Sequence, residues 1–175
     1  MDRLPHDPKN FREMVEADLR RGARLIIKVQ DEIDPQFRIA TPKGDWAIAV
    51  TLPNNEHRRS TIWRALSTFM VWKQALAFTL TTELYDPDSV WCAGVSPNER
   101  HVCLSRIRRE PRPWTKENFG TIDWMPESSI DPAIIDLLPK GPRVLTPKEV
   151  GDMVTWFGRE GKFPTVNLTT GEIGA

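Results

Sequence analysis

The two cysteines are the residues whose spacing most directly suggests chemistry. A four-residue turn at residues 96–99 would place Cys92 opposite Cys103 in a β-hairpin, with His101 on the same face. Three such side chains could hold a metal, and the cysteines could form a disulfide or act in redox chemistry. Structural zinc takes four ligands, usually in close Cys/His pairs, and the sequence has no CxxC and no second cluster. Because buried free cysteine is common and unreactive, we expect both to be packing residues, with no metal and no cofactor.

Histidines and carboxylates form a second candidate set, for a small hydrolase or nuclease. His57 precedes a long apolar stretch, His101 begins a strand-like segment, and Glu83 and Asp86 stand close together between them. A histidine serves as a general base near neutral pH when a carboxylate or nucleophile lies within reach. The sequence contains no GxGxxG, GxxxxGK[ST], GxSxG or HExxH motif that would place such groups together. Surface histidines and an Asp86 turn are the simpler interpretation, and hydrolysis stays an alternative.

Arginines are concentrated in residues 99–112, ERHVCLSRIRREPR. A β-ribbon bearing arginines can follow the phosphates of a nucleic acid, and Trp114 could stack on a base. Charged residues also protect sheet edges from pairing with other chains, which is the competing interpretation. The candidate nucleic-acid or partner-binding residues are Arg100, Arg106, Arg108, Arg109, Arg112 and Trp114.

The composition is that of an ordinary globular chain. Its 175 residues predict a single domain over 1–175, with 1–7 and 169–175 as possible loose ends. Hydrophobic residues make up 39% and charged residues 27%. Lys+Arg and Asp+Glu number 24 each, which argues against a dedicated nucleic-acid-binding protein. The first ten residues have no apolar core typical of a signal peptide, and two cysteines make no disulfide framework, so we expect a cytoplasmic protein.

One apolar stretch, residues 60–84, is expected to organise the fold. Its middle, residues 65–82, holds a single charge, Lys73, and its apolar residues recur at helical spacing, which predicts a long buried central helix. A membrane span is disfavoured because threonines, serine and Lys73 interrupt the run. Residues 78–84 alternate as in a strand, so the end of the helix stays open.

Smaller elements surround this stretch. Asp7-Pro8 predicts the start of a first helix, and Gly22 its end. Thr146-Pro147 with Glu149 predicts a capping box and a last helix, and Asp131-Pro132 predicts a short one. Six segments are expected to be strands: 25–30, 37–40, 46–52, 90–95, 101–107 and 120–125.

The hairpin formed by residues 90–95 and 101–107 has one register that agrees with its apolar pattern. With a four-residue turn, Trp91 faces Leu104, and Ala93 faces Val102 on the same side. A slip of one residue would reverse the faces of one strand. With the short connections between the earlier strands, this predicts an α+β fold: an antiparallel sheet packed around one long buried central helix, with smaller N- and C-terminal helices.

Function is less well defined than fold at this point. The leading hypothesis is a non-enzymatic binding or assembly protein that recognises a protein partner or its own copy as a homodimer. It depends on the absence of catalytic motifs, on interspersed charge and on seven tryptophans, because aromatic residues and arginine anchor interfaces. Nucleic-acid binding and hydrolysis are the two alternatives.

Overall fold

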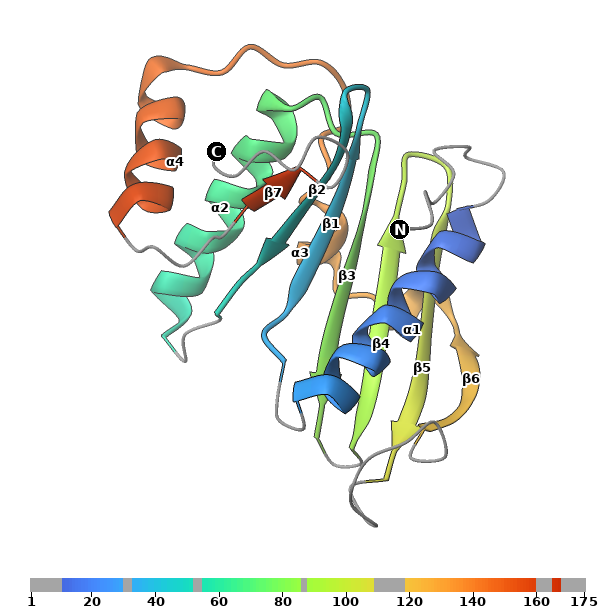
Figure 1. Cartoon of the computed structure of the whole chain (residues 1–175). Helices are drawn as coiled ribbons and strands as arrows, with labels where there is room; N and C mark the ends of the chain where they lie inside the picture. The colour runs from blue at the N-terminus through green and yellow to red at the C-terminus, as the bar shows by residue number, and fades with distance from the viewer. Residues whose placement is uncertain are drawn as a thin grey trace.

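The protein is described by a computed structural model covering residues 11–29, 33–51, 55–85, 88–108, 119–159 and 165–167. Its helices and strands confirm the α+β class (Figure 1). In chain order they are α1 (Phe11–Val29), β1 (Gln36–Thr41), β2 (Gly44–Ala49), α2 (Glu56–Trp72), β3 (Ala77–Leu84), β4 (Ser89–Val95), β5 (Arg100–Ile107), β6 (Phe119–Met125), the 3-10 helix η3 (Glu127–Ser129), α3 (Pro132–Ile135), α4 (Pro147–Arg159) and β7 (Thr165–Asn167).

One antiparallel sheet forms the middle of the molecule, with strand order β6-β5-β4-β3-β1-β2-β7. Helix α1 covers one face of the sheet over β3, β4 and β5, and α2 covers the opposite face, with α4 packed on its outer side (Figure 1). The predicted antiparallel sheet is confirmed. The single central helix is not, because the sheet separates two helices of similar length, 19 residues in α1 and 17 in α2.

Helix α1 is longer than the sequence predicts. Residues 25–29 continue the helix, so the strand predicted over 25–30 is wrong for the part that is described. Gly22 does not end the helix either. A Cβ atom at this position would lie 2.6 Å from Thr81 Cγ2, so glycine here permits close approach of the helix to β3. The helix start predicted at Asp7 lies outside the described residues.

Helix α2 ends earlier than predicted, at Trp72, and the chain re-enters the sheet as β3. Its end has the hydrogen bonds of a Schellman motif: Gln74 N donates to Val71 O at 3.1 Å, and Ala75 N donates to Met70 O at 2.8 Å. Gln74 takes the left-handed conformation, with φ 56°, where glycine is usual. Residues 77–84 are therefore a strand, as their alternation permitted, and the continuous helix over 60–84 is wrong.

The β4–β5 hairpin confirms the register expected from its apolar pattern. Trp91 pairs with Leu104, Cys92 with Cys103, and Ala93 with Val102. The cysteine face is covered by α1, where both cysteines are free and fully buried. Burial raises the pKa of the Cys103 thiol to about 12 and that of Cys92 well above its ordinary value, so both stay protonated at neutral pH.

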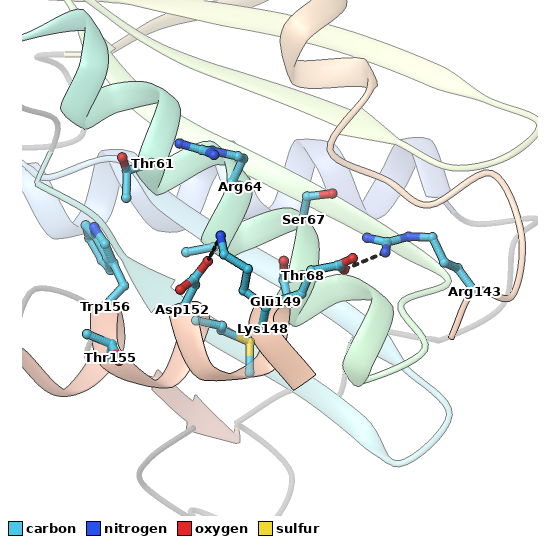
Figure 2. Close-up of a pocket in the computed structure, with 12 residues that line it drawn as sticks. Thr61, Arg64, Ser67, Thr68, Arg143, Lys148, Glu149, Asp152, Thr155 and Trp156 are labelled. Carbon is cyan, nitrogen blue, oxygen red and sulfur yellow. Dashed lines mark hydrogen bonds and ion pairs between the residues drawn. The ribbon is translucent and has the colours of Figure 1, made fainter. Parts of the chain in front are cut away.

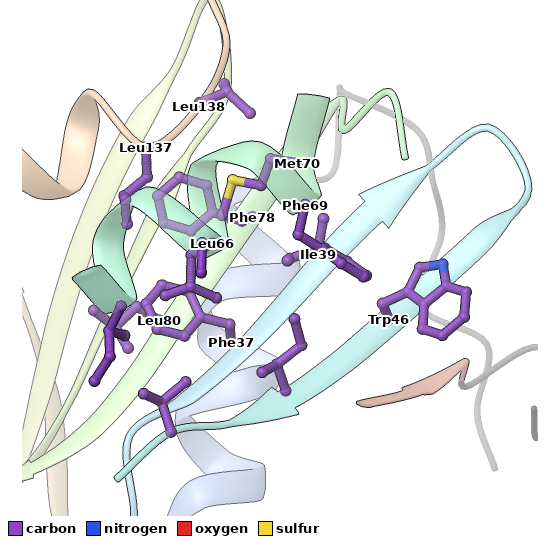
Figure 3. Close-up of a cluster of buried hydrophobic side chains, with 14 of the residues drawn as sticks. Phe37, Ile39, Trp46, Leu66, Phe69, Met70, Phe78, Leu80, Leu137 and Leu138 are labelled. Carbon is purple, nitrogen blue, oxygen red and sulfur yellow. The ribbon is translucent and has the colours of Figure 1, made fainter. Parts of the chain in front are cut away.

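The largest apolar core lies between α2 and the sheet (Figure 3). Phe69 from α2, Phe37 from β1 and Phe78 from β3 are all essentially inaccessible to solvent. Each fully buried side chain of this size contributes about 1.5–3 kcal/mol. The core fixes α2 over β1 and β3.

A charged cluster is buried on the other face, between α1 and strands β1 to β3. Arg38 donates to Asp45 Oδ2 at 2.6 Å and to Asp18 Oδ1 at 3.2 Å, and Thr79 donates to Asp18 Oδ2 at 2.6 Å. Arg21 also pairs with Asp18. Because buried charges are tolerated only when paired and hydrogen-bonded, these contacts specify how α1 sits on the sheet.

The C-terminal elements follow their local signals. Thr146 Oγ1 accepts from Glu149 N at 3.2 Å, as the capping box requires, and Asp131 caps α3 by accepting from Ala133 N at 2.8 Å. β7 adds an edge strand to β2.

Within the described part of the chain, no helix combines the length and the apolar character needed to cross a bilayer.

Candidate functional site

The histidines and carboxylates proposed for catalysis are dispersed. His57 is exposed in the first turn of α2, whereas Glu83 and His101 lie on the opposite face of the sheet. These two are separated by two strand spacings and by four residues along the strand, roughly 16 Å in all. Glu83 accepts a hydrogen bond from Ile33 N at 3.3 Å, and His101 Nε2 lies 3.8 Å from Glu99 Oε2. Asp86 is outside the described residues. The described groups share no cleft.

The arginines of β5 do not form one surface. Arg100 begins the strand and Arg106 lies near its end, six residues or roughly 20 Å away. Arg106 and Arg108 line a hollow of about 540 Å³ together with Asp88 and Asp123, so carboxylates interrupt the positive charge there. The remaining candidates of this set, Arg109, Arg112 and Trp114, lie outside the described residues.

A groove of about 560 Å³ lies between α2 and α4 (Figure 2). Its α4 side carries two ion pairs, Arg143–Glu149 at 2.5 Å and Lys148–Asp152 at 3.3 Å. The hydrogen bond from Arg143 lowers the pKa of the Glu149 carboxyl. Because these cations are matched by carboxylates in the same groove, its charge is largely compensated internally.

A second hollow, of about 1030 Å³, lies at the end of the sheet where α2 gives way to β3, and we call it the Trp72 pocket. Residues of four connections line it: the α2–β3 connection, the β1–β2 turn, the β4–β5 turn and the α3–α4 connection. Figure 1 shows where these connections lie in the fold. Its lining is mainly apolar. The apolar lining residues are Pro42, Val71, Trp72, Ala75, Leu76, Val95, Pro97, Ile135, Leu138, Pro139, Pro142, Leu145 and Val150.

The Schellman turn exposes the large apolar side chains at the mouth of the Trp72 pocket. Trp72 is 41% exposed and Leu76 51% exposed, although the helical pattern predicts that Leu76 is buried. The ammonium of Lys73 lies 3.8 Å from the centre of the Trp72 ring, a cation–π contact that orients the indole. Val95 and Leu138 are buried and form part of the floor. The pocket is therefore an open apolar depression.

The charged groups of the Trp72 pocket have one sign. Arg100, Lys140 and Arg143 contribute to its lining, and among the described lining residues none is an aspartate or glutamate. Arg143 also borders the α2–α4 groove, where it pairs with Glu149. Neither Arg100 nor Lys140 forms an ion pair with any residue in the described part of the chain. Two of the three cations at this pocket are thus available to a ligand.

The pocket was not predicted from the sequence, apart from Arg100. Its lining residues come from connections far apart in the chain. Its opening lies where α2 ends, and no glycine in the sequence marks that end. Across the described ranges, no three His, Cys, Asp or Glu side chains are grouped so that they could hold a metal ion.

Likeness to other proteins adds nothing to the interpretation of the Trp72 pocket. Comparison of the chain with models of protein families, with curated proteins and with solved structures found no match.

Proposed function

We propose that the protein is a non-enzymatic binding protein that holds a segment of a protein partner in the Trp72 pocket. The single observation that carries the proposal is the pairing of a large apolar depression with Trp72 and Leu76, both substantially exposed at its mouth. Tryptophan and arginine are the residues that most often anchor protein interfaces, and Trp72 and Arg100 both line this pocket.

The lining chemistry favours binding over catalysis. General acid–base catalysis needs a group that titrates near the working pH, such as histidine or a carboxylate. The described lining of the Trp72 pocket offers neither, and it includes no cysteine. The polar side chains present are Gln74, Ser96, Arg100, Lys140 and Arg143, which can orient a ligand.

The test uses protein labelled with fluorinated tryptophan, in which each of the seven tryptophans gives a fluorine NMR signal. The Trp72 signal is assigned by its loss in Trp72→Phe. Short uncharged peptides containing leucine are expected to shift this signal saturably. Leu76→Glu should abolish the shift, whereas Val154→Glu should not, because Val154 is 55% exposed on α4 and lies outside the pocket lining. An unmoved Trp72 signal, or an equal shift in Leu76→Glu, would contradict the proposal.

A further inference from the structure

We infer that the segment held in the Trp72 pocket is acidic as well as apolar, with carboxylates that pair with Arg100 and Lys140. This inference rests on the proposed function, because it names the chemistry of the partner at the same site. It concerns a protein segment and not a lipid or a nucleic acid.

Charge segregation at the Trp72 pocket is the first argument. The chain as a whole has equal numbers of acidic and basic residues, 24 of each. Of the three cations that line the pocket, Arg143 is paired with Glu149, and the described lining includes no carboxylate that could pair with Arg100 or Lys140. In the neighbouring α2–α4 groove, Glu149 pairs with Arg143 and Asp152 pairs with Lys148. A ligand with negative charge would supply at the Trp72 pocket what Asp152 and Glu149 supply in the groove.

The position of the cations is the second argument. Arg100 follows the β4–β5 turn, whereas Lys140 and Arg143 belong to the α3–α4 connection. The apolar floor includes Val95 from the first of these segments and Leu138 from the second. An extended chain lying across the pocket could place apolar side chains on the floor and carboxylates at the two segments that carry the cations.

The size of the Trp72 pocket is the third argument, and it favours a peptide over a small molecule. Its volume of about 1030 Å³ lies at the upper end of ligand sites, which span about 300–1,000 Å³. Small-molecule sites usually enclose most of the ligand surface. Here Trp72 and Leu76 stay substantially exposed at the mouth, which suits a segment that continues beyond the pocket on both sides.

The expected contribution of charge is modest, because these cations are exposed. A single exposed ion pair changes an affinity by roughly 1.5- to 5-fold, and charge complementarity acts mainly on selectivity and on the association rate. Apolar contact with the floor supplies the remaining affinity. Binding should therefore weaken with salt but not disappear.

The experiment compares three end-capped peptides of equal length: one with two leucines flanked by glutamates, and its twins with glutamine or lysine in place of glutamate. Binding is followed by the Trp72 fluorine signal and by calorimetry at low and high salt. The glutamate peptide is expected to bind about tenfold more tightly than the lysine twin, with the glutamine twin between them. The double variant Arg100→Glu/Lys140→Glu should reverse this order.

Arg58→Glu/Arg59→Glu is the matched control, since it makes the same change of net charge at exposed positions in the first turn of α2, outside the pocket lining. It should keep the glutamate preference. Equal affinity for all three peptides in the wild-type protein would overturn the acidic character and leave the binding function standing. If no peptide shifts Trp72, the proposed function fails as well. If the double variant does not fold, the affinity of the wild-type protein for the glutamate peptide at low and high salt tests the acidic character instead: a loss of affinity at high salt supports it, and an unchanged affinity contradicts it.

Discussion

Replacing Gly94 by alanine should destabilise the protein through one identifiable clash. Gly94 lies in β4 directly beneath α1. An added Cβ would lie 2.2 Å from Val15 Cγ2 and 3.0 Å from Phe11 Cζ, and both side chains are buried. Because Val15 is fully enclosed, the methyl group fits only if α1 moves away from the strand.

The expected magnitude follows from this geometry. Overpacking of a well-packed core costs about 1–3 kcal/mol. For a chain of this length each kcal/mol lowers Tm by roughly 2–4 °C, so the Gly94→Ala protein should melt about 2–12 °C lower. Gly151→Ala is the matched control, because a Cβ at Gly151 in α4 meets no atom within 4 Å. It should stabilise the protein by up to about 1 kcal/mol through helix propensity.

The assay is reversible urea unfolding followed by circular dichroism, with calorimetry for Tm. Val15→Ala alone loses buried apolar volume, about 1.6 kcal/mol for two methyl groups plus a cavity term. In the double variant with Gly94→Ala, the new methyl group occupies part of the space vacated by Val15. The two costs should therefore be less than additive by at least about 0.5 kcal/mol. A Gly94→Ala protein as stable as wild type, or strictly additive costs, would refute the assigned contact between α1 and β4.

Three further changes test other features. Asp18→Ala should lower the free energy of unfolding in urea by about 3–5 kcal/mol, because it leaves Arg38 buried without one of its carboxylates. The control Glu16→Ala removes an exposed ion pair with Arg20 and should cost at most about 1 kcal/mol. Similar costs for the two variants would argue against the buried cluster. Folding raises the pKa of the Cys103 thiol from 9.0 to about 12, so between these pH values the folded state keeps a proton that the unfolded state loses. The free energy of unfolding should therefore fall as pH rises from 9 towards 12, and it should fall less steeply in Cys103→Ala. Parallel pH profiles of the two proteins would contradict this. Gln74→Gly should raise stability by about 1 kcal/mol, since glycine takes the left-handed conformation without strain; a loss of stability would argue against the Schellman turn.

Local patterns in the sequence were sufficient where neighbouring residues decide the structure. The register of the β4–β5 hairpin follows from alternation, because a slip of one residue would put Trp91 and Leu104 on opposite faces. The caps at Thr146 and Asp131 follow from side chains that accept hydrogen bonds from nearby backbone N–H groups. These features depend on contacts within a few residues or across one turn.

Glycine was misleading as a local signal in both directions. Gly22 was expected to end a helix, but α1 continues through it to Val29. Glycine is needed there because β3 packs too closely to leave room for a Cβ atom. Helix α2 ends at Trp72, and the left-handed residue of the turn that follows is Gln74, which adopts φ 56° without being glycine. A rule based on residue type alone therefore places neither helix boundary.

The sequence by itself determined the α+β class, the antiparallel pairing of neighbouring strands and the register of the β4–β5 hairpin, since these follow from short-range apolar periodicity and from the shortness of the connections. Only the tertiary structure decided that two helices lie on opposite faces of the sheet, that Asp18 meets Arg38 and that Trp72 and Arg100 line the same pocket. The physical reason is that these contacts join residues from helices, strands and connections that lie far apart in the sequence. Their proximity depends on how the whole chain closes, which no local period records.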